Sequence, residues 1–134
     1  MFEAVFESRS QLEKGKVPGG AILAHCMGLG KTLQNITLIH TIMTNFPDQI
    51  KHVLVLAPVN TLKNWEEEFY KWLNDDLEDD VEVHEVSGEK DNWGRTDRLK
   101  YWRKNGGALI MGYVLIYFKE VDIDPKKYCY FFGS

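Results

Sequence analysis

The segment that most constrains this chain is AHCMGLGKT, residues 24–32, which resembles a phosphate-binding loop. Such a loop follows the pattern G-x-x-x-x-G-K-[ST], and Gly30, Lys31 and Thr32 match its last three positions. His25 stands where the pattern has its first glycine. The match is incomplete, so the segments on either side have to show whether the loop binds a phosphate.

The flanking segments are those that a phosphate loop needs, a strand before it and a helix after it. The loop works by presenting backbone N–H groups and a helix amino terminus to the phosphate. A short apolar run, 21–24, precedes it, and apolar residues at helical spacing predict a largely buried helix over 32–44. The alternative is a glycine-rich turn that binds nothing, but such a turn has no need of Lys31 and Thr32.

The rest of the chain continues to alternate between strands and helices. The apolar patterns predict strands at 53–58, 81–86 and 108–113. They also predict helices at 1–12 and 60–74. A basic helix is expected to begin at Asp91 or Asn92 and to run to Lys104, closed by Asn105-Gly106-Gly107. This order predicts an α/β fold, a parallel sheet with helices on both faces.

The helix expected at 60–74 has the clearest pattern in the chain. Asn60 or Thr61 can cap its start, and three glutamates, 66–68, lie toward its positive end. The expected apolar face consists of Leu62, Trp65, Phe69, Trp72 and Leu73. Since both tryptophans share this face, we expect them in the core rather than stacked on nucleic acid.

Two stretches resemble a known family. GAILAHCMGLGKTLQ (20–34) and VLVLAPVNTLKNWEEEFYKW (53–72) are similar to motifs I and Ia of the Swi/Snf-type chromatin-remodelling ATPases, in the helicase-like superfamily. His25-Cys26, in place of the usual Asp-Glu, resembles the ATRX branch. Helicase-like loops commonly lack the first glycine, so His25 marks a branch and not a defect. The resemblance covers residues 1–113, ending with ALIMGY at 108–113.

The resemblance implies a RecA-like P-loop lobe that binds ATP and Mg²⁺. Carried over by position, the nucleotide-binding residues are Met27, Gly28, Leu29, Gly30, Lys31 and Thr32. Lys31 would reach the β- and γ-phosphates, and the Thr32 hydroxyl would ligate Mg²⁺.

The same resemblance implies partners and a compartment. Together with a second helicase lobe, such a lobe moves along double-stranded DNA on nucleosomes in the nucleus. Its DNA contacts would fall on Pro58, Asn60 and Asn64. For Asn60, simple helix capping remains an open alternative.

Parts of the family's catalytic apparatus are not found in this sequence. No Walker B Asp-Glu pair follows a strand, and in Phe118-Lys119-Glu120 a lysine stands where the metal ligand belongs. No second lobe is present, and no catalytic residue is assigned. We therefore expect residues 1–113 to be a partial ATP-binding lobe, an incomplete first helicase lobe, and 114–134 to be a divergent tail. The 134 residues alone are expected to be inactive.

Composition and residue spacing argue against several other classes of protein and site. A net charge of −4 gives no bulk attraction to nucleic acid, so binding requires a local patch. The sequence has no apolar run long enough for a bilayer and no secretory signal, and two cysteines favour an intracellular protein. The histidines and cysteines lack zinc-site spacing.

Two alternative functions remain. One is a truncated module that binds a nucleotide or a partner without hydrolysis. The other is a small P-loop kinase or GTPase, although a guanine-reading Asn-Lys-x-Asp is absent.

Overall fold

The computed structural model of the chain describes residues 10, 14, 30–73, 81–86, 92–113 and 129–133. The strand expected at 21–24 lies outside the described residues. So do nearly all of the helix expected at 1–12 and residues 114–128 of the expected tail.

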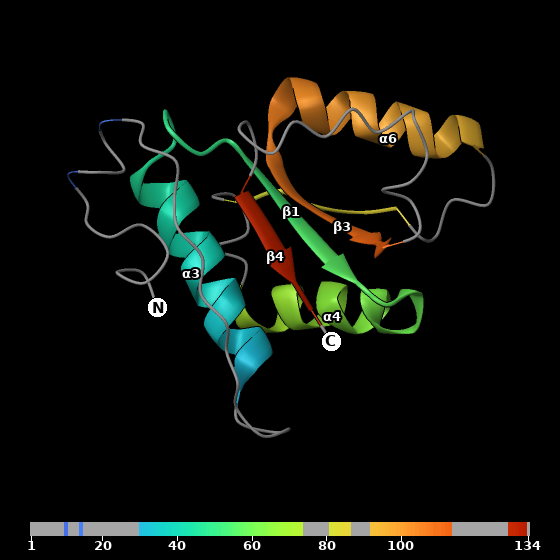
Figure 1. The fold of residues 1–134 in the computed structure, drawn as a ribbon, viewed down its shortest axis with the longest axis horizontal. Helices are drawn as coiled ribbons and strands as arrows, with labels where there is room; N and C mark the ends of the chain where they lie inside the picture. Colours follow the sequence, from blue (N-terminus) through green and yellow to red (C-terminus); the bar gives the residue numbers. More distant parts are fainter. Residues whose placement is uncertain are drawn as a thin grey trace.

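The centre of the molecule is a parallel sheet whose described strands are ordered β2-β3-β1-β4 (Figure 1). The strands are β1 (His52–Ala57), β2 (Val83–Glu85), β3 (Gly107–Gly112) and β4 (Cys129–Phe132). Val53 of β1 lies opposite Ala108 of β3 on one side and Cys129 of β4 on the other. Because β1 and β3 are covered on both faces, their sequences are continuous apolar runs without polar alternation.

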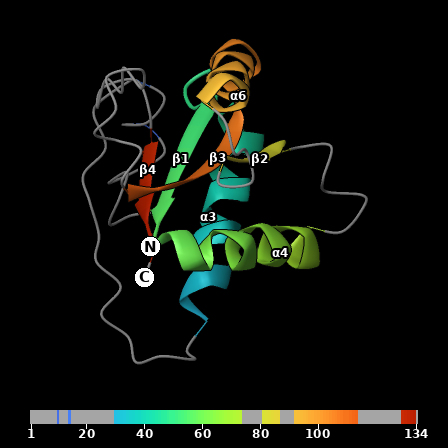
Figure 2. The same ribbon diagram turned by 90° about the vertical axis from the view of Figure 1, so that its right-hand side faces the viewer.

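Three described helices pack on this sheet: α3 (Lys31–Asn45), α4 (Leu62–Trp72) and α6 (Asn92–Asn105). The first two share one core with alternate residues of β1, Val53, Val55 and Ala57. The intervening residues, Leu54 and Leu56, belong to a second core with α6. Figures 1 and 2 show α3 and α4 crossing one another, with α6 well separated from both. The predicted α/β fold, a RecA-like parallel sheet with helices on both faces, is confirmed.

The start of α4 differs from the prediction. A short 3-10 helix, η1 (Val59–Thr61), comes first. Thr61 occupies the N-cap position of α4, but its side chain makes no capping hydrogen bond to the helix. Its hydroxyl instead donates to the Pro58 carbonyl at 2.8 Å, and its backbone N–H donates to the same oxygen at 2.9 Å. The predicted side-chain cap is wrong for Thr61, because the 3-10 turn draws its hydroxyl backward.

The two tryptophans of α4 have opposite environments. Trp65 is 3% exposed and packs beside Phe69, with a ring-centroid distance of 6.5 Å, as predicted. Trp72 is 41% exposed, so its predicted place in the core is wrong. Its indole N–H donates to the Glu68 carboxylate at 2.6 Å, and the Lys71 ammonium lies 4.9 Å from its ring centroid. The helix ends at Trp72, and Leu73 takes the buried position instead.

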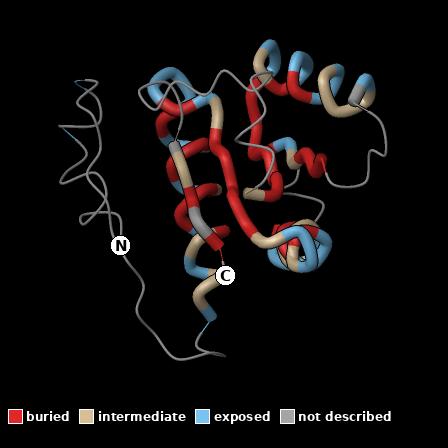
Figure 3. The backbone as a smooth tube through the Cα atoms, turned by 45° about the vertical axis from the view of Figure 1, so that its right-hand side comes forward, coloured by how far each residue is buried: buried red, intermediate tan, exposed pale blue. Residues whose placement is uncertain are grey.

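The end of α6 has the predicted glycine signal. Gly106 and Gly107 have positive φ angles of 85° and 110°, which glycine adopts without steric cost. The Gly106 N–H donates to the Trp102 carbonyl at 2.8 Å, and the Gly107 N–H donates to the Lys51 carbonyl at 2.9 Å. These bonds join the last turn of α6 to the beginning of the central strands. Figure 3 shows the result, a buried sheet with helices whose outer faces are exposed.

Candidate nucleotide-binding site

The described part of the predicted phosphate loop is its last three residues, at the start of α3. Gly30 is the N-cap and has φ 72° and ψ 29°, a left-handed conformation. A methyl group at this position would meet no atom within 4 Å, so there is space for a side chain. The left-handed backbone conformation is therefore the reason for a glycine here. Met27, Gly28 and Leu29 lie outside the described residues.

The first turn of α3 has the electrostatic character of an anion site. No side chain caps the helix, and its first turn contains no acidic residue. The first backbone N–H groups of an α-helix lack acceptors within the helix, and the helix dipole gives this end a partial positive charge. Lys31 and Thr32 are half-buried at this end, while Gly30 is exposed. An anionic phosphate fits both the backbone donors and the lysine charge.

The tertiary arrangement brings the beginning of α3 toward the edge of the sheet where the strands end. Figures 1 and 2 show α3 starting at the end of the molecule where α4 lies and toward which β1 runs. In parallel α/β sheets, ligands bind beyond the carboxyl ends of the strands. Gly30, Lys31 and Thr32 therefore lie at the end of the sheet where such folds place their ligands, and a ligand at this position stays a prediction.

The residues expected to contact DNA follow β1 directly at the same edge. Pro58 is half-buried, whereas Asn60 in η1 and Asn64 in the first turn of α4 are both exposed. Val59, between them, is 63% exposed. The surface of this turn thus offers two amides and one apolar side chain to a partner, and no acidic group.

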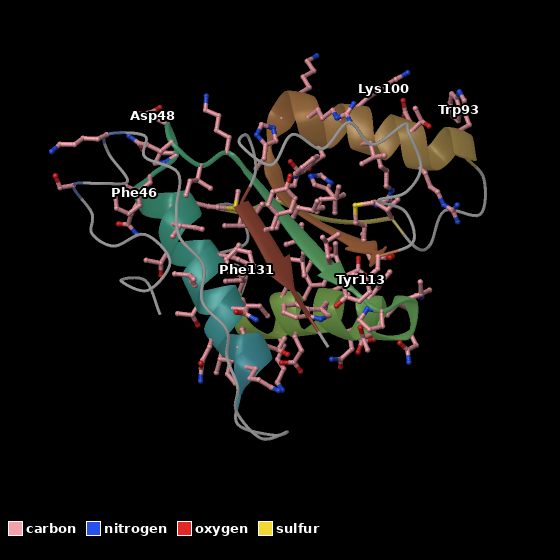
Figure 4. The ribbon with its side chains drawn as sticks, in the orientation of Figure 1. Phe46, Asp48, Trp93, Lys100, Tyr113 and Phe131 are labelled. Carbon is pink, nitrogen blue, oxygen red and sulfur yellow. The ribbon has the colours of Figure 1, made fainter. Side chains whose placement is uncertain are left out.

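Three residues at this edge were not identified from the sequence: Gly112, Tyr113 and Gly133. The Tyr113 hydroxyl at the end of β3 donates to the Gly133 carbonyl, and the Gly133 N–H donates to the Leu56 carbonyl at 2.7 Å. Figure 4 labels Tyr113 at this end of the sheet. The hydrogen bonds connect the ends of three strands. The available sequence signal was the run Tyr128–Phe132 before a glycine, which has strand-forming residues.

Both glycines at this edge allow close approaches. A methyl group at Gly112 would lie 2.9 Å from a Val59 methyl, and one at Gly133 would lie 2.7 Å from the Trp65 indole. The η1 turn therefore sits against the end of β3, and the end of β4 sits against α4. These contacts fix the shape of the surface beside the candidate site.

The described residues whose pKa values are clearly perturbed lie elsewhere, between β2 and α6. Burial lowers the pKa of His84, against the opposing influence of the Glu82 carboxylate 3.8 Å from its Nε2. The same carboxylate raises the pKa of Tyr101. The His84 and Tyr101 rings are 5.5 Å apart and edge-on. This cluster is separate from the nucleotide site.

Neither a metal cluster nor a membrane span is found in the part of the chain that the structure describes. No group of three or more His, Cys, Asp or Glu side chains there is arranged to hold a metal ion. No described helix combines the length and hydropathy needed to cross a bilayer. The contact of Thr32 to Mg²⁺ stays a prediction.

Comparison with known proteins agrees with the motifs. The family model described as SNF2-related domain matches residues 9–127. The transcriptional regulator ATRX homolog of Drosophila melanogaster is 41% identical over 114 residues, 84% of this chain. The Caenorhabditis elegans homolog is 41% identical over 133 residues, 95% of the chain. Human transcriptional regulator ATRX is 41% identical over 116 residues, again 84% of the chain.

These matches cover a small part of each relative. The aligned region is 9%, 10% and 4% of the length of the fly, nematode and human proteins, respectively. The family match continues past residue 113, after which the sequence pattern predicts a divergent tail. That boundary remains a prediction. The resemblance to ATRX-like Swi/Snf ATPases is confirmed.

Proposed function

This chain belongs to the SNF2-related family, and on that premise we propose that it is the ATP-binding part of a DNA-dependent ATPase that remodels chromatin in the nucleus. The observation that carries the proposal is the left-handed Gly30 that opens α3, followed by Lys31 and Thr32. The start of α3 lies at the end of the molecule toward which the parallel strands run (Figure 1).

The proposed ligand is ATP with Mg²⁺. Backbone N–H groups from Met27 to Thr32 would surround the phosphates, and Gly30 allows the chain to turn from the loop into the helix. The Lys31 ammonium would neutralise the β- and γ-phosphates, and the Thr32 hydroxyl would face the metal ion. The residues present fit this role, because no side chain or carboxylate of α3 competes with a phosphate at its first turn.

The proposed partner is double-stranded DNA, contacted through Pro58, Asn60 and Asn64. Exposed amides and the amino-terminal turn of a helix suit contacts to phosphates, which position a duplex without reading its sequence. This turn and the start of α3 lie at the same end of the molecule (Figure 2), and α3 packs against α4. A conformational change at the nucleotide site would therefore reach the DNA contacts through these two helices. A second helicase lobe and the nucleosome complete the proposed assembly.

A second candidate function is a nucleotide-binding or partner-binding module without hydrolysis. The observation favouring it is that, among the described residues, the positions at and just after the ends of β1, β3 and β4 are Ala57, Pro58, Gly112, Tyr113 and Gly133. None of these residues carries a carboxylate that could activate water or hold a metal ion; the described strand that ends in a carboxylate is β2, at Glu85, and β3 separates it from β1. Under this candidate, ATP binds but is not turned over.

Substitution of Lys31 tests the proposed nucleotide site. We expect Lys31→Ala to reduce binding of a fluorescent ATP analogue in the presence of Mg²⁺ at least tenfold, because a charge at the phosphates is lost. Lys63→Ala, which removes an exposed lysine from the first turns of α4, is the matched control and should bind as the unaltered chain does. Equal binding by both variants would contradict the assignment of the loop.

Hydrolysis separates the two candidates. Phosphate release is measured with and without duplex DNA for the chain together with a second helicase lobe, because the 134 residues alone are expected to be inactive. Turnover that duplex DNA stimulates and Lys31→Ala abolishes supports the ATPase. Binding that depends on Lys31, with no multiple turnover, supports the non-hydrolysing module.

A further inference from the structure

The outward face of α6 presents an aromatic and basic stripe that neither core uses. Trp93, Asp97, Lys100 and Lys104 follow the spacing i, i+4, i+7 and i+11, so they lie on one side of the helix. The opposite side is buried through Leu99 and Trp102. Figure 4 shows Trp93 and Lys100 projecting outward from α6, away from the sheet.

Trp93 is the most exposed large apolar side chain in the described part of the protein, at 78%. Tryptophan is highly buried on average, since its indole carries a large apolar area. Its counterpart on the inner side, Trp102, is 1% exposed and donates its indole N–H to the Gly107 carbonyl at 2.9 Å. Core packing therefore explains a tryptophan at position 102, but it does not explain a tryptophan at position 93.

The charge of α6 is opposite to that of the chain as a whole. The helix contains five basic residues and one acidic residue, a net charge of +4, whereas the net charge of the chain is −4. Part of this charge has a structural role, because Arg98 donates to the Glu85 carbonyl at 3.2 Å. Lys100 and Lys104 are exposed on the stripe, and both are available to a polyanion.

We propose that this face of α6 binds an unpaired nucleic-acid strand, with a base stacked on Trp93 and phosphates beside Lys100 and Lys104. Single strands are bound through aromatic platforms for base faces together with basic side chains for the backbone. A duplex hides its base faces within the stack and would leave the Trp93 indole unused. An acidic peptide satisfies the lysines but has no base face to stack on the indole.

The proposal goes beyond the proposed ATPase function and does not depend on it. Its residues lie on the other face of the sheet from α3 and α4, which carry the nucleotide and duplex sites. Binding of a single strand should therefore be unchanged by Lys31→Ala. Failure of one proposal would leave the other intact.

Fluorescence anisotropy with a labelled oligothymidylate and the whole chain tests the proposal. We expect Trp93→Ala to weaken binding at least about fivefold, the loss typical of one stacked base. The double variant Lys100→Gln/Lys104→Gln should weaken binding and make the slope of log K against log salt shallower by about 1.4, or 0.7 per phosphate contact. Asp97→Asn should tighten binding, because a negative charge is removed from the middle of the stripe.

Matched variants on α4 serve as controls. Tyr70→Ala removes an exposed aromatic ring, and Lys71→Gln removes an exposed lysine, both on the other face of the sheet. These controls should bind the oligothymidylate as the unaltered chain does. Because Trp93 and Asp97 are exposed, their variants should keep the same thermal midpoint.

Three results would overturn the proposal. The first is duplex DNA of the same length binding as tightly as the single strand, with no effect of Trp93→Ala. The second is an Asp- and Glu-rich peptide binding through the stripe while the oligothymidylate does not bind. The third is an equal loss of affinity in the α6 and α4 variants, which would indicate nonspecific attraction to charge.

Discussion

Gly30 and Gly106 are both required by the fold, and substituting each separately tests two different reasons. Both residues have positive φ angles, 72° and 85°. A methyl group at Gly30 would meet nothing within 4 Å, whereas one at Gly106 would lie 2.6 Å from the Lys51 carbonyl oxygen. Gly30 is thus required by backbone conformation alone, and Gly106 by conformation together with a close approach.

The structure gives different magnitudes for the two sites. Gly30→Ala should cost about 1–2 kcal/mol, the penalty of a left-handed conformation for a residue with a Cβ. For 134 residues this lowers the thermal midpoint by about 4–7 °C. Gly106→Ala must also displace the Lys51 carbonyl, which accepts the Gly107 N–H at 2.9 Å. Loss of that bond adds about 1–3 kcal/mol, for a total decrease of about 7–18 °C.

Asparagine substitutions separate the two causes, because asparagine adopts the left-handed conformation more readily than alanine but still has a Cβ. Thermal unfolding followed by circular dichroism should show that Gly30→Asn recovers most of the stability that Gly30→Ala loses. Gly106→Asn should recover little, since its Cβ meets the same carbonyl oxygen. Equal losses for the two alanine variants, or equal recovery by asparagine at both sites, would refute this reasoning.

Two further predictions concern stability. In urea titrations, Trp65→Ala should lower the free energy of unfolding by about 3–5 kcal/mol, because it leaves a cavity in the core. Trp72→Ala should change this free energy by less than about 1 kcal/mol, because its indole is exposed. Similar losses for both variants would contradict the assigned environments. Burial lowers the folded-state pKa of His84 below the value of 6.5 expected in the unfolded chain. The folded protein therefore favours the neutral imidazole, and the resulting stability is fully present above about pH 6.5. This stability is lost as the pH falls through the folded-state pKa. The free energy of unfolding should therefore fall more steeply between pH 7 and pH 5 in the unaltered chain than in His84→Gln, and parallel curves would exclude a contribution from His84.

Much of the fold was predictable because its signals are local. Continuous apolar runs identified β1 and β3, and helical spacing identified α3 and α4, each to within a few residues. The basic helix α6 was identified by its opening residue, Asp91 or Asn92, and its closing glycines. The Asn105-Gly106-Gly107 sequence correctly marked the end of α6, since positive φ angles favour glycine. Of the predicted nucleotide site, Gly30, Lys31 and Thr32 stand at the start of a helix as expected. Their ligand stays a prediction.

Other features depend on where neighbouring elements begin and end, and the sequence pattern gave them incorrectly. Trp72 has the helical spacing of a core residue, yet α4 ends there and leaves its indole exposed. Thr61 has the residue type of a helix cap, yet the 3-10 turn before it directs its hydroxyl to Pro58. In both cases a local propensity was outweighed by the geometry of the neighbouring turn.

The sequence by itself determined that the segments of β1, β3, α3, α4 and α6 become strands and helices, because periodicity and glycine positions act within a few residues. Only the tertiary structure decided that β4 pairs with β1 and that Tyr113 joins the end of β3 to Gly133. It also decided that Trp93 faces outward while Trp102 is buried, although both residues belong to the same helix. Strand pairing and burial depend on which distant surfaces meet, and a local pattern does not contain that information.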